Sequence, residues 1–236
     1  MTTEPLPVTF KYHFKRGNNL IEELVIALHP ESLDLIPEQK QALPPWSLLE
    51  FERCPNCPDS MDEQRHCPQM AALAPVITKF EDILSHDTLQ LYVISSERLV
   101  FQQTTAQRAI GSLMGLMIAS CGCPHTAFLK PMARFHLPLA SEEETIYRAC
   151  SMYLLAQYFV RQKGEKPDYD LTGLKENYHN LHLVNTAIAR RLRTASLTDS
   201  SVNAIVMLDL FTKAMPMVIE KALAEIRYLF VPYLQH

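Results

Sequence analysis

The first 105 residues contain two pairs of segments in which apolar and polar side chains alternate, the pattern of half-buried strands. Residues 8–14 (VTFKYHF) are followed by the turn sequence RGNN and then by residues 20–29 (LIEELVIALH). Residues 89–95 (LQLYVIS) and 99–103 (LVFQQ) form the second pair, joined through residues 96–98. We expect both pairs to lie in one small antiparallel sheet.

From Thr104 onward the apolar spacing becomes helical, and we expect a bundle of helices there. Residues 106–119 are apolar almost throughout and predict a buried helix. Ser141 begins the next helix with a capping box, because Glu144 follows three residues later, and Gly164 ends that helix.

The last third of the chain predicts two more helices. Asp170 can cap a helix over residues 171–194. Thr198 or Asp199 can cap another, which we expect to break near Pro216 and to end around residue 230.

One helix is also expected between the two strand pairs. It starts near Pro68, because proline suits the first position of a helix, and Pro75 should kink or restart it. The change of pattern divides the chain into residues 1–103, with the sheet and this helix, and residues 104–236, with the helical bundle. We expect the two parts to pack as one unit.

Composition and charge exclude several classes of protein. The 236 residues are 47% hydrophobic and 20% charged, which is typical of a soluble globular protein. A net charge of −4 gives no basic surface for nucleic acid, and a helix C-terminus explains the one tight basic run, Arg190, Arg191 and Arg193. The chain starts without a basic and apolar leader, and residues 110–119 are too short to span a membrane. We therefore expect a cytoplasmic protein with no membrane contact.

The cysteines carry the most specific chemical signal. Four of the six are followed directly by proline: Cys54, Cys57, Cys67 and Cys123. Composition alone gives about 0.4 such dipeptides by chance. Proline holds the residue before it in an extended conformation, which would fix the direction of a cysteine thiolate before a metal ion binds. Four thiolates complete a tetrahedral shell, so we predict a metal site with these four ligands.

Zinc suits this ligand set best, and a four-iron cluster is the alternative cofactor. Cys123 lies far from the other three in sequence, so the ion would join the sheet region to the bundle. His66, Cys121 and His125 lie beside the predicted ligands and are alternates or neighbours of the site. Two other interpretations stay open: reduced cysteines in prolyl turns without an ion, and thiol redox chemistry at CPNC.

A second group of polar residues lies in and beyond the segment RFHLP. It is a candidate enzyme site, and its members are Arg134, His136, Glu143, Glu144, Arg148 and Asp209. Asp209 lies within an apolar run, and an arginine such as Arg134 or Arg148 is its expected partner. No glycine-rich phosphate loop is present in the sequence.

Several longer stretches resemble an uncharacterised bacterial family: CPNCP…HCP, RFHLP…EETIYRA, LVNTAIARRLR and NAIVMLDLF. The likeness covers nearly the whole chain. It implies cysteines at the positions of Cys54, Cys57, Cys67 and Cys123, with serine usual at the position of Cys121. The family has no established activity, so the resemblance supports the ligand set and implies no reaction.

The fold class predicted from the sequence is α+β: a small antiparallel N-terminal sheet with a cysteine-rich metal knuckle, followed by a C-terminal helical bundle. The function expected first is a metal-stabilised binding or regulatory protein whose bundle receives a small molecule or a protein partner. An enzyme with a site near Arg134, His136, Glu143 and Glu144, or an iron–sulfur or thiol redox sensor, is the alternative. The sequence does not fix the ligand, the oligomeric state or whether the protein is an enzyme.

Overall fold

The structure is a computed structural model that describes residues 5–37, 42–195 and 199–234. It contains five strands: β1 (Val8–Arg16), β2 (Asn19–Leu28), β3 (Leu35–Ile36), β4 (Thr88–Ile94) and β5 (Leu99–Thr105). Its α-helices are α1 (Pro68–Lys79), α2 (Ala106–Ser120), α3 (Lys130–Arg134), α4 (Glu142–Gln162), α5 (Thr172–Ala195), α6 (Ser200–Ile226) and α7 (Val231–Leu234). Short 3₁₀ helices are η1 (Pro45–Ser47), η2 (Asp59–Met61), η3 (Pro124–Leu129) and η4 (Arg227–Phe230).

The five strands form one antiparallel sheet in the order β3-β2-β1-β4-β5. Alternate side chains of β1, namely Phe10, Tyr12 and Phe14, are buried on one face, and the opposite face meets solvent. The predicted single antiparallel sheet is confirmed, and so is the α+β class. The sequence missed β3 because two residues are too few to show an alternating pattern.

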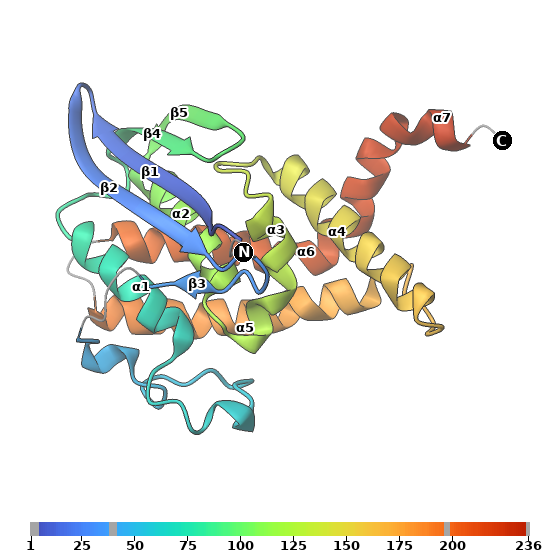
Figure 1. The fold of residues 1–236 in the computed structure, drawn as a ribbon, viewed down its shortest axis with the longest axis horizontal. Helices are drawn as coiled ribbons and strands as arrows, with labels where there is room; N and C mark the ends of the chain where they lie inside the picture. Colours follow the sequence, from blue (N-terminus) through green and yellow to red (C-terminus); the bar gives the residue numbers. More distant parts are fainter. Residues whose placement is uncertain (1–4, 38–41, 196–198, 235–236) are drawn as a thin grey trace.

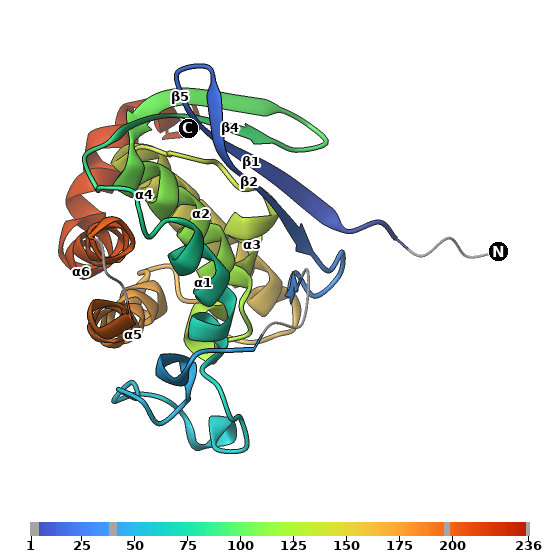
Figure 2. The ribbon, with the colours of Figure 1, turned by 90° about the vertical axis from the view of Figure 1, so that its left-hand side faces the viewer.

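The molecule is built in layers (Figures 1 and 2). The sheet lies on one side, α1 and α2 lie beneath it, and α5 and α6 form the far side. Helix α2 is therefore enclosed between the strands and α6, and most of its residues are buried. This confirms the buried helix that its apolar sequence predicts.

Two clusters of buried side chains stabilise this arrangement. The larger cluster joins the sheet, α1 and α2 to residues of α5 and α6 such as Ile188 and Ile205. It therefore contains residues from both sides of residue 104. The smaller cluster joins α4, α5 and the second half of α6 through residues such as Ile146, Leu174 and Met215.

Two of the four cysteine-proline dipeptides begin helices. Cys67 precedes α1 and Cys123 precedes η3, each with an extended backbone (ψ 122° and 128°) and with proline at the first helical position. Ser141 and Glu144 form the predicted capping box at the start of α4. Gly164, with a φ of 80°, follows the end of α4 as expected.

The cap of α5 differs from the prediction. Asp168, and not Asp170, accepts the backbone N–H of Gly173 at 2.8 Å, and Leu171 turns the chain with a φ of 60°. Asp168 also accepts the hydroxyl of Tyr153 at 2.8 Å. The helix therefore begins at Thr172, and its capping carboxylate comes from two positions before the predicted residue.

Neither internal proline ends its helix. α1 continues through Pro75 to Lys79, and α6 continues through Pro216 to Ile226, so the predicted break near Pro216 is wrong. The ribbon of α6 changes direction in its second half, which is the expected effect of a proline that removes one hydrogen bond (Figure 1).

The predicted cap of α6 is not formed. Asp199 precedes α6 but does not cap it, because its carboxylate accepts hydrogen bonds from Ser85 instead. Thr198, the other predicted cap, lies outside the described residues.

The C-terminal helices extend away from the body of the molecule (Figure 1). By length and composition alone, the stretch Ser200–Leu234 is long and apolar enough to cross a membrane. The core helix of a soluble protein can pass the same test. The sequence analysis missed this stretch, because charged residues interrupt its apolar runs. Only 28% of its most apolar window is buried, and residues such as Met217, Tyr228 and Tyr233 are exposed.

Candidate functional site

The four cysteines followed by proline lie near one another, although Cys123 is distant in the sequence. Burial raises the pKa of Cys54 to about 12, and the charges of Cys67, Cys123 and Cys57 add to this effect. Burial also raises the pKa of Cys123 to about 12, with further contributions from Cys121, Cys67 and Cys57. The thiols are thus close enough for the charge on one to disfavour ionisation of another.

Hydrogen bonds connect the two segments that carry these cysteines. His125 Nε2 donates to the carbonyl of Asn56, between Cys54 and Cys57, at 2.6 Å. Asn56 donates in turn to the carbonyl of Asn180 on α5 at 3.1 Å. His66 uses Nδ1 to contact Ser47 Oγ at 2.8 Å. The two histidines therefore help to hold the loops in place.

The thiol side chains do not form a ready coordination shell. Across the described residues, no group of three or more His, Cys, Asp or Glu side chains is arranged to hold a metal ion. The chemistry of four neighbouring thiols still fits a soft divalent cation, and the guanidinium of Arg53, which binds Glu50 and Asp62, lies near Cys57. The metal site thus stays a prediction.

The two cysteines without proline differ from each other, because Cys121 lies beside the thiol group and Cys150 lies elsewhere. Cys121 donates its thiol to the carbonyl of Ile118 at 3.2 Å, and burial raises its pKa to about 12. Cys150 is buried in the smaller core cluster between α4 and α5.

Arg191 supports the loop that precedes the cysteines, a role that the sequence analysis missed. Its side chain is only 1% exposed, and its three nitrogen groups donate to the carbonyls of Leu48, Leu49 and Glu52 at 2.8–3.2 Å. The explanation of the basic run by a helix C-terminus therefore fails for Arg191. The apolar neighbours Ile188 and Leu192 are a sequence signal that this arginine lies on a buried face.

The six residues of the candidate enzyme site do not all lie together. His136 and Arg148 line a common cavity. Glu144 closes the capping box, and Glu143 is exposed beside it. Arg134 lies 3.9 Å from Glu97, and Asp209 lies on α6.

Asp209 has a different partner from the one predicted. Its carboxylate lies 2.7 Å from Nδ1 of His182 on α5, and this contact replaces the expected arginine. Both side chains are about one-quarter exposed, so the pair lies at the edge of the α5–α6 contact and not in the core.

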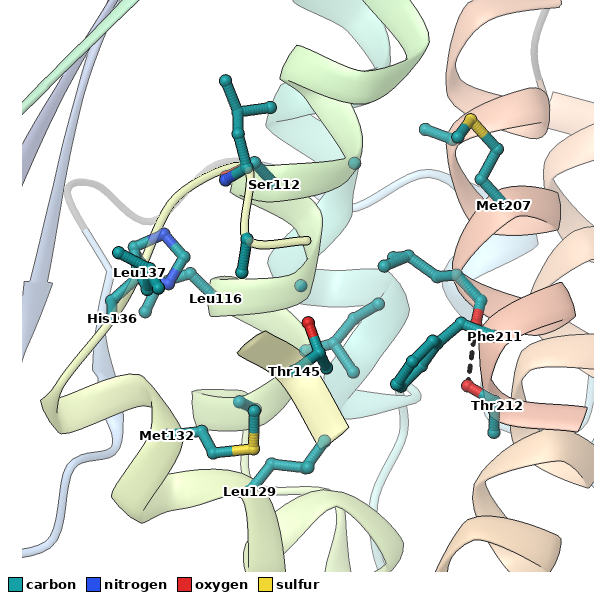
Figure 3. Close-up of a pocket in the computed structure, with 18 of the residues that line it drawn as sticks. Ser112, Leu116, Leu129, Met132, His136, Leu137, Thr145, Met207, Phe211 and Thr212 are labelled. Atoms are coloured by element: carbon teal, nitrogen blue, oxygen red, sulfur yellow. Dashed lines mark hydrogen bonds between the residues drawn. The ribbon is translucent and has the colours of Figure 1, made fainter. Parts of the chain in front are cut away.

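A cavity of about 340 Å³ lies among the helices (Figure 3). Helices α2, α3, α4, α5 and α6 and the segment 136–140 contribute its lining, which is mainly apolar. Its size is within the range of small-molecule sites, which combine an apolar lining with a few polar groups. The polar side chains in the lining are those of Gln107, Arg108, Ser112, His136, Glu142, Thr145, Arg148, Tyr178, Asn185 and Thr212.

Small residues on α2 make room for the cavity. Gly111, Gly115 and Ala119 recur every four residues on one face, and all three line the cavity. A methyl group added at Gly115 would lie 3.9 Å from Leu208 of α6, the ordinary distance of a van der Waals contact. This spacing of small residues is the sequence signal that could have indicated the cavity.

His136 is a neutral group in the cavity wall. Its Nε2 is hydrogen-bonded to the hydroxyl of Tyr12, which comes from the buried face of β1. Burial lowers the pKa of His136 to about 3, and the positive charge of Arg148 acts in the same direction.

Arg148 brings a positive charge to the same part of the cavity. Its Nη2 donates to the carbonyls of Met132 and Phe135 at 3.0 and 2.8 Å. Burial lowers the pKa of its guanidinium, although the charge of Glu144 opposes this. Among the described residues, no carboxylate lies within salt-bridge distance of Arg148, so two carbonyls are its direct partners and Glu144 acts on it from farther away.

Asn185, on α5, places an unpaired acceptor in the lining. Its Nδ2 donates to Thr212 Oγ1 at 3.1 Å, and that hydroxyl donates to the carbonyl of Leu208 at 2.7 Å. Because the threonine hydrogen is already used, the amide nitrogen must face Thr212, and this fixes the orientation of the side chain. The other amide atom, Oδ1, is buried and has no hydrogen-bond partner among the described residues.

The fold and the cavity define an α+β protein in which an antiparallel sheet packs on helices, and the pocket lies among the helices. The chain belongs to a family described as a domain of unknown function (DUF6901), whose pattern matches residues 8–231. This confirms the resemblance to a family without an established activity. No curated protein and no solved structure matched the chain.

Proposed function

We propose that this protein is a cytoplasmic small-molecule-binding protein whose ligand occupies the cavity among α2, α3, α4, α5 and α6. The cavity itself carries the proposal, because a concave and mainly apolar space of this size is the usual form of a small-molecule site. The polar side chains of His136, Arg148 and Asn185 in its lining add the few polar groups that such sites contain.

Binding is favoured over catalysis by the placement of the candidate enzyme residues. Only His136 and Arg148 of that group line the cavity, whereas Glu144 and Asp209 have partners elsewhere. Burial lowers the pKa of His136, so its imidazole is neutral at physiological pH. It therefore carries no proton to donate, and an enzyme at this site would need a different residue as its general acid.

The proposal includes a structural zinc ion held by Cys54, Cys57, Cys67 and Cys123. The mutual effect of these thiols on their pKa values supports it, as does the contact between His125 and the backbone of Asn56. Four thiolates and one Zn²⁺ leave two negative charges, and the buried Arg191 near Cys54 offsets part of that charge. Small movements of the side chains would be needed to close the shell.

A neutral apolar probe tests the binding function. We expect 1-octanol to show saturable binding by ligand-detected NMR. Gly115→Leu should abolish the signal by filling the cavity, and Gly115→Ala should weaken it while keeping the fold. The control is Leu155→Ser, because Leu155 is exposed on the outer face of α4. Loss of binding in the control but not in the Gly115 variants would contradict the proposal.

Elemental analysis of anaerobically purified protein tests the metal. One zinc per chain in a colourless protein is the expected result. Iron with visible absorbance would instead support the cluster, and a metal-free protein of unchanged stability would contradict a structural ion.

A further inference from the structure

We propose that the cavity selects an amphipathic carboxylic acid of about eight to twelve carbons, with a hydrogen-bond donor toward the end opposite the carboxylate. This assignment rests on the proposed binding function and adds the chemical class of the ligand. Arg148 binds the carboxylate, and Oδ1 of Asn185 accepts a hydrogen bond from the donor at the other end of the ligand.

The volume of the cavity limits the size of the ligand. An engineered cavity of about 150 Å³ holds benzene, which has six non-hydrogen atoms. In proportion, 340 Å³ holds roughly fourteen such atoms. A carboxylic acid of eight to twelve carbons has this size, whereas nucleotides and most cofactors are larger.

The charge at one end favours an anion. Arg148 uses Nη2 for two carbonyls, and its Nε and Nη1 hydrogens have no partner among the described residues. Of the two arginines in the lining, Arg108 is the exposed one, at the rim. A carboxylate beside Arg148 would form charge-assisted hydrogen bonds and would give this guanidinium the direct ionic contact that it lacks among the described residues.

The acidic groups around this end leave the Nε and Nη1 hydrogens of Arg148 free for a ligand. Glu144 is nearby and its negative charge acts on Arg148, but its carboxylate accepts the N–H of Ser141 and makes no direct contact with the guanidinium. Glu142 is exposed at the rim of the cavity, and Arg98 adds a second positive charge near Arg148. His136 contributes no charge, because its imidazole is neutral.

The opposite end favours a donor. Figure 3 shows His136 and Met132 on one side of the cavity and Thr212 with Phe211 on the other. Asn185, the partner of Thr212, is only 2% exposed, and its Oδ1 is an acceptor without a donor among the described residues. An unpaired buried acceptor costs free energy, so a ligand hydroxyl or N–H that reaches it would be favoured.

Four probes with the same chain length test both ends. We expect calorimetry at pH 7 to show that octanoate binds about tenfold or more tightly than 1-octanol, and octylamine weakest, because a charged hydrogen bond adds that much. We expect 8-hydroxyoctanoate to bind at least as tightly as octanoate. Arg148→Gln should remove the preference for octanoate over octanol, Arg148→Lys should keep part of it, and Arg161→Gln, on the exposed side of α4, should leave it unchanged.

The outcomes separate the ligand class from the binding function. If octanol binds in the cavity and octanoate binds no more tightly, the assignment of a carboxylic acid as the ligand is wrong, while the proposed binding function stands. If 8-hydroxyoctanoate binds more weakly than octanoate, the donor assigned to Asn185 is wrong. If no probe responds to Gly115→Leu, the proposed function itself has failed.

Discussion

The thiol region and the cavity both contact α5, but they differ in the space beside their polar groups. In the thiol region, separate segments of the chain contact each other directly: Arg191 uses all of its nitrogen groups on three carbonyls, and His125 is bonded to Asn56. Buried atoms without a partner among the described residues occur there too, on Asn56 and Gln69, but neither residue lines the cavity. In the cavity, Asn185 keeps an unpaired oxygen and Arg148 lacks a carboxylate partner among the described residues. Direct contacts between segments stabilise the folded chain, whereas unpaired groups beside an apolar space are typical of a ligand site. We therefore assign stability to the first region and binding to the second.

The largest effect is expected at the predicted metal ligands. Cys67→Ser or Cys123→Ser should lose the zinc ion and lower Tm by about 15 °C or more, because metal binding is coupled to folding. Metal content and thermal unfolding measure the effect. Cys121→Ser, two positions before Cys123, is the matched control and should keep the ion. Equal losses in all three variants would argue against a specific ligand set.

Replacement of Arg191 should be the next most damaging change. Arg191→Met leaves three buried carbonyls without donors, and we expect a loss of about 3–5 kcal/mol in the free energy of unfolding. Urea denaturation measures this loss. Arg190→Met is the control, because the neighbouring side chain is exposed. Similar values for the two variants would show that the carbonyl contacts do not stabilise the loop.

A smaller effect is expected at the cap of α5, which borders the cavity side of the molecule. Asp168→Ala should lower Tm by about 2–4 °C at pH 7, whereas Asp170→Ala should not. The N–H of Gly173 and the hydroxyl of Tyr153 lower the pKa of Asp168. Its contribution is therefore complete above the unfolded pKa of about 3.9 and is lost as the pH falls through the lower folded pKa. An Asp168→Ala deficit that persists at pH 2 would contradict this assignment.

The smallest effect has the opposite sign. Gly115→Ala should stabilise the fold by about 0.5–1 kcal/mol, because alanine favours a helix more than glycine and the added methyl group has room beside Leu208. Chemical denaturation of the two proteins measures the gain. A clear loss of stability would mean that Gly115 is needed for helix packing and not for ligand space.

Local sequence patterns predicted the helices and strands, whereas the side-chain partners depend on contacts between residues that are distant in the sequence. The strand pairs, the capping box at Ser141 and the helix start at Pro68 follow from neighbouring residues, and each was predicted correctly. The partner of Asp209 and the role of Arg191 depend on which helices meet, and a sequence pattern does not contain that information.

The same reason explains why the cavity was not predicted. Its lining comes from five helices and one connecting segment, and no short motif contains more than a few of its residues. The alternation of the strands predicted a buried face of the sheet, but not that Tyr12 on that face would contact His136. The continuation of α6 through Pro216 also depends on tertiary packing, which can compensate for one missing hydrogen bond.

The contacts of Arg191 have a consequence for biosynthesis. The carbonyls that it binds precede it by 139–143 residues, so the ribosome completes the cysteine loop long before its supporting arginine emerges. At a translation rate of about 5–20 residues per second, the nascent chain carries an unsupported loop for roughly 7–28 seconds. During that time its thiols are open to oxidants and to competing cations. If the loop binds the proposed zinc ion, stable loading has to wait until Arg191 has been synthesised, late in translation.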